Sequence, residues 1–120
     1  MLDFSEKRKN RRIDIRLPIA YKQLRRMESS PRGVLTKNLS TGGVRFHTDN
    51  FISLSCRMVI ELTIPSMAKP LRAISKVAWI RKLPNSASFE IGNQFLDMSK
   101  DDKNLISDYV ENSFEVPSQA

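Results

Sequence analysis

Apolar and polar residues alternate over the first stretch of the chain that carries a hydrophobic pattern. Apolar side chains there occupy every second position: Ile13, Ile15, Leu17, Ile19 and Tyr21. The other face of the same stretch carries Asp14, Arg16 and Lys22. A period of two is typical of a strand that buries one face. We therefore predict a strand over residues 13–21, followed by a loop through the polar run 22–32.

Strand patterns return several times further along the chain. They occur at residues 33–39, 44–48, 57–64, 71–82 and 87–96. Pro65 and Pro70 bracket one connection, and the turn signal at 84–86 marks another. Six short strands with no helix between them indicate a mainly β fold, either an antiparallel barrel or a sandwich.

The hydrophobic period changes near the C-terminus. Ser99 followed by Asp102 is typical of a helix start. Apolar side chains then recur at helical spacing: Leu105, Ile106, Tyr109 and Val110. We predict an amphipathic helix over residues 100–112, which could cover an open end of a barrel, and a frayed tail over 113–120.

Length and charge define the organisation of the chain. A chain of 120 residues suits one domain with one core. We place that domain at 13–112 and expect residues 1–12 to form a flexible basic arm, because the run 7–12 has no apolar member. The net charge is +7, yet residues 7–45 hold 12 basic and two acidic side chains, a net charge of +10. This third of the chain is therefore expected to bind an anion.

Several function classes are disfavoured by what the sequence lacks. No apolar run approaches the roughly 20 residues of a membrane-spanning helix, and no signal-peptide pattern occurs, so we expect a cytoplasmic protein without membrane insertion. The single cysteine, Cys56, and the single histidine, His47, cannot form an internal disulfide or a metal ligand set. Without a nucleophile elbow or metal-ligand spacing, we expect no enzymatic activity, no metal and no cofactor.

Two polar clusters are expected to meet in space. Arg12 immediately precedes the first predicted strand, and Asn38 ends the second. Antiparallel pairing of these strands brings Asn38 beside Arg12. The loop from Asn38 to Gly43 offers short polar side chains and two glycines, which allow unusual backbone angles and the close approach of a ligand. Arginine beside such a loop suits a guanine nucleotide with exposed phosphates.

The two clusters also carry a family resemblance. Arg8 to Arg12 has the form Arg-x-x-x-Arg, and Asn38 to Gly43 has the form Asn-x-Ser-x-x-Gly. Each motif alone is common, but their order and spacing, with Glu90 to Phe95 following, are specific. In these features the chain closely resembles the PilZ domain family over about residues 6–110. The resemblance implies a six-stranded antiparallel β-barrel with a C-terminal helix, and a stand-alone bacterial receptor for the second messenger cyclic di-GMP.

The resemblance also implies roles for individual residues. Arg8 and Arg12 would contact guanine and phosphate, Asn38 and Ser40 would hydrogen-bond a guanine edge or phosphate, and Gly43 would allow the loop to turn. Ligand binding would order the arm and change a surface that a downstream protein recognises. Neither that protein nor the ligand stoichiometry follows from the sequence.

Other residues near the motifs are ambiguous. Candidate additional ligand contacts are Lys9, Arg11, Gly42 and Arg45, although exposed surface charge is the simpler interpretation of Arg45. Trp79 could stack on a guanine, but its alternation with Val77 favours a position in the core. Two other functions stay open beside the receptor: a basic small-barrel nucleic-acid-binding protein, which is less expected because surface aromatics are few, and a PilZ-type adaptor that binds no ligand.

Overall fold

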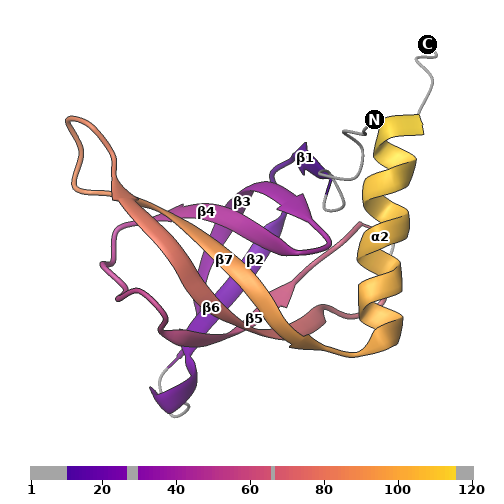
Figure 1. Ribbon diagram of the computed structural model, residues 1–120, viewed down its shortest axis with the longest axis horizontal. Coiled ribbons are helices and arrows are strands. Elements are labelled where there is room, and N and C mark those ends of the chain that lie inside the picture. The colour runs from indigo at the N-terminus through magenta and orange to yellow at the C-terminus, as the bar shows by residue number, and fades with distance from the viewer. Residues whose placement is uncertain (1–10, 27–29, 66, 116–120) are drawn as a thin grey trace, which may run out of the picture.

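The computed structural model describes residues 11–26, 30–65 and 67–115 (Figure 1). Its strands are β1 (Arg12–Asp14), β2 (Pro18–Gln23), β3 (Arg32–Ser40), β4 (Gly43–Thr48), β5 (Arg57–Leu62), β6 (Leu71–Lys82) and β7 (Phe89–Met98). A short 3-10 helix, η1 (Leu24–Arg26), follows β2, and the helix α2 (Lys100–Glu115) follows β7.

Six of the strands form a closed antiparallel barrel. They pair in the order β3, β2, β5, β6, β7 and β4, and β4 pairs back onto β3 to close the sheet. The short β1 pairs antiparallel with the end of β3 outside this ring. The predicted six-stranded barrel with a C-terminal helix is confirmed, and the helix stands at one end of the barrel in Figure 1.

The first predicted strand is two strands in the structure. Ile13, Leu17 and Ile19 of the predicted apolar face are buried, as the alternation indicates. The strand itself is interrupted between β1 and β2. At the interruption the Thr36 hydroxyl of β3 accepts a hydrogen bond from the Leu17 amide at 2.9 Å and donates one to the Ile15 carbonyl. A buried side chain from the partner strand thus replaces part of the backbone ladder, and a bulge in β3 follows it.

The barrel interior is filled by the apolar faces of the strands. Its most deeply buried large side chains include Leu39, Phe46, Met58, Ile60 and Ile91. The predicted alternation from Met58 to Ile64 is confirmed, because all four apolar side chains of that set are buried. Ile106 and Val110 of α2 join the same core, so the helix closes one end of the barrel.

The helix begins where the sequence predicts. The Asp102 amide donates a hydrogen bond to Ser99 Oγ at 3.1 Å, which caps the first turn. The helix continues to Glu115, past the predicted end at residue 112. Within the described parts of the chain, no helix has the length and apolar character needed to span a bilayer.

Candidate ligand-binding site

The strand register brings the two polar clusters together on the outer face of the sheet. Arg12 lies opposite Ser40, and Asp14 lies opposite Asn38, across the β1–β3 ladder. The predicted proximity of Arg12 and Asn38 therefore agrees with the register. Asn38 also lies opposite Arg45, which lies opposite Gly92, which in turn lies opposite Trp79. Because paired positions share a face, these four positions form one row across four strands of the barrel. We call it the polar row, after Asn38 and Arg45.

The turn between β3 and β4 is held by the side chain of Ser40. Ser40 Oγ accepts hydrogen bonds from the amides of Gly42 at 3.0 Å and Gly43 at 3.2 Å. No glycine among the described residues has a positive φ, so Gly43 is not needed for an unusual backbone angle. It is needed for close packing, since a Cβ at Gly43 would lie 2.0 Å from the Asn93 carbonyl oxygen. The expectation of an unusual backbone angle at this glycine was therefore wrong.

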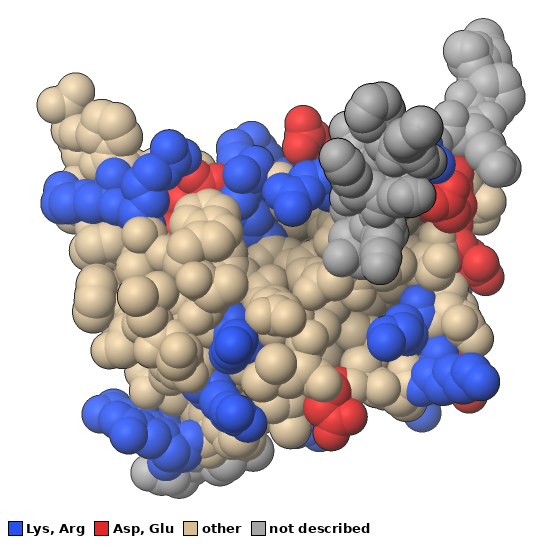
Figure 2. Space-filling model, viewed as in Figure 1, with Lys and Arg blue, Asp and Glu red and all other residues tan. Residues whose placement is uncertain are grey.

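A cavity of about 630 Å³ opens beside this turn. Its lining includes Arg12, Asn38 and Ser40 from the predicted site. Basic side chains on the lining are Arg12, Arg45 and Lys103, against one acidic side chain, Asp97. Figure 2 shows basic side chains along the upper rim of the viewed face, above a largely uncharged and hollowed surface. An anion with flat, uncharged parts fits such a lining.

Trp79 lines the cavity instead of packing in the core, so the favoured prediction for this residue was wrong. Its side chain is 39% exposed. The strand register shifts between Val77 and Trp79, and this bulge turns Trp79 to the outer face. The indole then lies across Gly92, where an added Cβ would be 2.3 Å from Trp79 Cε2. Gly92 thus gives Trp79 the space to lie against β7 with an exposed ring surface.

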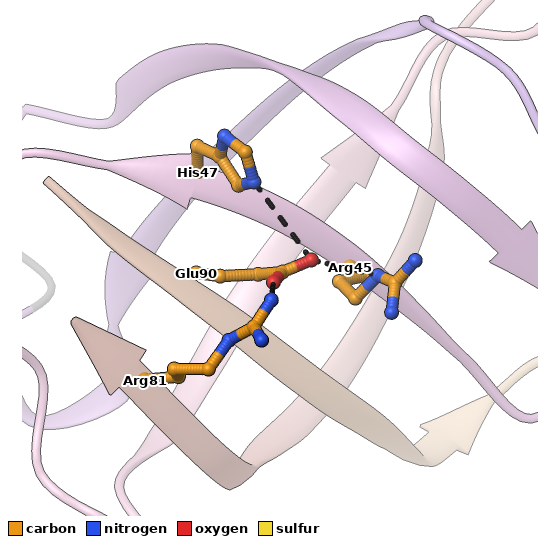
Figure 3. Close-up of polar contacts among 4 residues, drawn as sticks. All are labelled: Arg45, His47, Arg81 and Glu90. Atoms are coloured by element: carbon orange, nitrogen blue, oxygen red, sulfur yellow. Dashed lines mark hydrogen bonds and ion pairs between the residues drawn. The ribbon is translucent and has the colours of Figure 1, made fainter. Parts of the chain in front are cut away.

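A buried carboxylate lies next to the polar row. Glu90 is only 3% exposed, although it faces outward, because Arg45, Arg81 and His47 cover it (Figure 3). Arg45 Nε lies 3.0 Å from Glu90 Oε2, and Arg81 Nη2 pairs with Oε1. Burial by itself raises the pKa of the Glu90 carboxyl. The hydrogen bond from Arg81 and the charges of Arg45 and Arg81 outweigh that effect and hold the pKa below its ordinary value.

The stability of the domain is expected to fall as the solution is acidified below about pH 6.5. Burial lowers the pKa of His47 from its ordinary 6.5, so its contribution to stability is present above pH 6.5 and is lost as the pH falls through the folded value. Because the pKa of Glu90 is also lowered, a second loss of stability is expected as the pH falls below its ordinary value of 4.5. Urea unfolding midpoints across this range should show both phases. The His47→Gln variant should lack only the upper phase, and identical profiles would contradict this assignment.

The remaining predicted site residues fall in different places. Arg8 and Lys9 lie outside the described residues, whereas Gly42 lines the cavity. Arg11 forms an ion pair with Glu111 of α2, with 3.0 Å between Nη1 and Oε1. Arg45 is half-buried and paired with Glu90, so its interpretation as plain surface charge was wrong.

Sequence reasoning missed two parts of the cavity. Lys103 enters the lining from the first turn of α2, and no motif connects that residue to the turn at Ser40. Sequence reasoning assigned Gly92 no role of its own beyond its place in the segment from Glu90 to Phe95. A glycine within a strand often marks the close approach of another group, and this signal could have led to the Trp79 ring.

Comparison with known proteins identifies the fold family. The model of the PilZ domain matches residues 6–112. The chain belongs to the PilZ domain family. The match covers all the strands and most of α2, and both motifs lie within it. No curated protein sequence matches the chain.

Solved structures share this PilZ fold. The Bacillus subtilis inhibitor of motility, MotI/DgrA, superposes with a TM-score of 0.76 at 16% identity, over 91% of this chain and 51% of that one. The PilZ domain of Escherichia coli YcgR with c-di-GMP superposes with a TM-score of 0.67 at 14% identity, over 91% of this chain and 92% of that one. The K. pneumonia MrkH–c-di-GMP complex superposes with a TM-score of 0.66 at 16% identity, over 90% of this chain and 52% of that one. This chain thus spans about half the length of MotI/DgrA and MrkH.

Proposed function

We propose that this PilZ domain is a receptor for cyclic di-GMP, which binds in the cavity beside the β3–β4 turn. The observation that carries the proposal is that Arg12 of the first motif and the second motif's Asn38 and Ser40 line that cavity, with Arg12 opposite Ser40 on the β1–β3 ladder. The surplus of basic side chains on the lining supports an anionic ligand. The YcgR and MrkH structures, which share the fold, contain c-di-GMP.

The lining residues match the chemistry of this ligand. Arg12 and Lys103 can pair with its two phosphates, and Arg8 would add a second guanidinium from the arm. Asn38 and Ser40 provide hydrogen-bonding groups beside them. The exposed Trp79 ring offers a surface on which a guanine could stack, a contact that contributes about 1–3 kcal/mol in nucleic-acid complexes.

These contacts are of the size that a micromolar complex needs. Each charge-assisted hydrogen bond contributes roughly 1.5–3 kcal/mol net. Four of them at the upper end of this range, with one stacked base, exceed the roughly 8 kcal/mol that a micromolar dissociation constant requires. The excess then offsets the cost of fixing the ligand and the arm.

The same proposal gives the chain a signalling role without catalysis. We place the arm before β1 at residues 1–11, the barrel with its helix at 12–115 and the tail at 116–120. In this scheme the arm closes over the bound ligand, and the surface of ligand and arm is what a downstream protein recognises. Arg11, the last residue of the arm, forms an ion pair with Glu111 of α2.

Thermal unfolding with and without ligand tests the proposal. Cyclic di-GMP at about a hundredfold its dissociation constant should stabilise the folded state by roughly 2.7 kcal/mol, which raises the melting temperature by roughly 10 °C. Cyclic di-AMP carries the same charge and serves as the matched control ligand, for which a smaller shift is expected. No shift with cyclic di-GMP would contradict the receptor and leave the ligand-free adaptor. Equal shifts with both nucleotides and with a single-stranded oligonucleotide would favour the nucleic-acid binder.

A further inference from the structure

Arg45 occupies a central place in the polar row, because β4 lies between the strands that carry its two polar neighbours. One neighbour is Glu90 of β7, whose Oε2 lies 3.0 Å from Arg45 Nε (Figure 3). The other neighbour is Asn38 of β3. With its amide oxygen toward Arg45, Asn38 accepts hydrogen bonds from Arg45 Nη2 at 2.7 Å and Nε at 3.1 Å. This orientation is the one that satisfies both groups.

Arg45 is engaged in an ion pair with the Glu90 carboxylate. A buried carboxylate needs paired cations to offset its desolvation, and Glu90 obtains them from Arg45 and Arg81. If Arg45 left this pair to bind a phosphate, the buried negative charge of Glu90 would lose one of its two guanidinium partners. Arg12 and Lys103 line the same cavity, and neither is among the described residues that pair with Glu90, so they are better suited to bind phosphate.

We propose that Arg45 is a positioning residue of the site and not a direct ligand contact. Glu90 holds the guanidinium of Arg45, and the guanidinium fixes the orientation of the Asn38 amide. The amide oxygen is then engaged, and the amide NH2 is the donor that Asn38 can offer. A donor complements the O6 and N7 acceptors of guanine, whereas the 6-amino group of adenine is itself a donor. The proposal rests on the proposed function and adds to it a source of guanine selectivity.

The arrangement also separates Arg45 from Arg81. Both pair with Glu90, and Arg81 is the more exposed of the two. Only Arg45 reaches Asn38, and Arg81 does not line the cavity. Substitution of either arginine by lysine keeps a positive charge near Glu90 but removes the planar fork. The Arg81→Lys variant is therefore a matched control for any effect that acts only through the Glu90 pairing.

Titration calorimetry with cyclic di-GMP and cyclic di-AMP tests the proposal on Arg45→Lys, Asn38→Ala and the double variant. Arg45→Lys should lower the ratio of the two affinities about tenfold, as Asn38→Ala does, while Arg81→Lys leaves it unchanged. The double variant should be no less selective than Asn38→Ala alone, because each of the two changes removes the same interaction, the oriented contact of the Asn38 amide with guanine. Additive losses in affinity for cyclic di-GMP would overturn the proposal and assign Arg45 a contact of its own. An unchanged ratio in Arg45→Lys would overturn it as well.

A second measurement needs no ligand and separates this inference from the receptor itself. In the nuclear magnetic resonance spectrum of the free protein, the side-chain amide signals of Asn38 should move in Arg45→Lys and stay in place in Arg81→Lys. If they do not respond to Arg45→Lys, the positioning role is wrong whether or not cyclic di-GMP binds. If they respond while the wild-type chain binds no cyclic di-GMP, the proposed receptor fails and selectivity through Arg45 fails with it, but the contact stands.

Discussion

Replacing Arg12 by alanine is expected to weaken cyclic di-GMP binding at least tenfold with little effect on the melting temperature of the free domain. Arg12 lines the cavity opposite Ser40, and its own side chain is exposed. The change removes charge-assisted hydrogen bonds of roughly 1.5–3 kcal/mol each and no core contact. Titration calorimetry measures the affinity, and the same loss is expected for Arg8→Ala.

The control for this prediction is another exposed arginine. Arg25 lies in η1, away from the residues that line the cavity. Arg25→Ala lowers the net charge by the same amount, so it reports any effect of overall charge alone. Equal affinities for Arg12→Ala and Arg25→Ala would mean that Arg12 attracts the ligand only through the general field of the basic region.

Replacing Gly43 by alanine is expected to damage both stability and binding. The new Cβ would lie 2.0 Å from the Asn93 carbonyl oxygen, which belongs to the backbone of β7 and cannot rotate away. The β4–β7 ladder must shift to relieve this clash, at a cost of roughly 1–3 kcal/mol in the free energy of unfolding. The same shift moves the turn held by Ser40, so cyclic di-GMP affinity should fall at least tenfold. Urea unfolding and calorimetry measure the two effects.

A second glycine provides the matched control. Gly33 also lies in a strand, but an added Cβ there would meet nothing within 4 Å. Gly33→Ala should change the free energy of unfolding by less than about 1 kcal/mol and leave ligand affinity unchanged. If Gly43→Ala is as stable as Gly33→Ala, the close approach of β4 to β7 is not a constraint on the site.

The parts of the fold that were predictable depend on local periodicity. The alternation over β5 and the helical spacing in α2 each predicted the buried face, because these elements present one regular face to the core. The β1–β2 interruption was not predictable in this way. It depends on the Thr36 hydroxyl, which lies in another strand and meets the chain at Ile15 and Leu17 only after folding.

The site shows the same division between local and non-local causes. The short motifs and antiparallel topology were enough to predict that Arg12 lies near Asn38. Trp79 was assigned to the core because one extra residue in β6 reverses which side chains face outward, and an alternation rule does not include such a bulge. The role of Arg45 depends on Glu90, which is far away in sequence and becomes its neighbour only through the β4–β7 pairing.

Amide-resolved nuclear magnetic resonance of the domain during titration with cyclic di-GMP tests the central claim most directly. We predict that the largest shifts occur in the β3–β4 turn at residues 38–43, at Gly92 to Gln94, and at the indole N–H of Trp79. Residues of β2 and β5 on the opposite wall should shift little. Spectra that do not change, or changes centred on β2 and β5, would contradict a cyclic di-GMP site at this cavity.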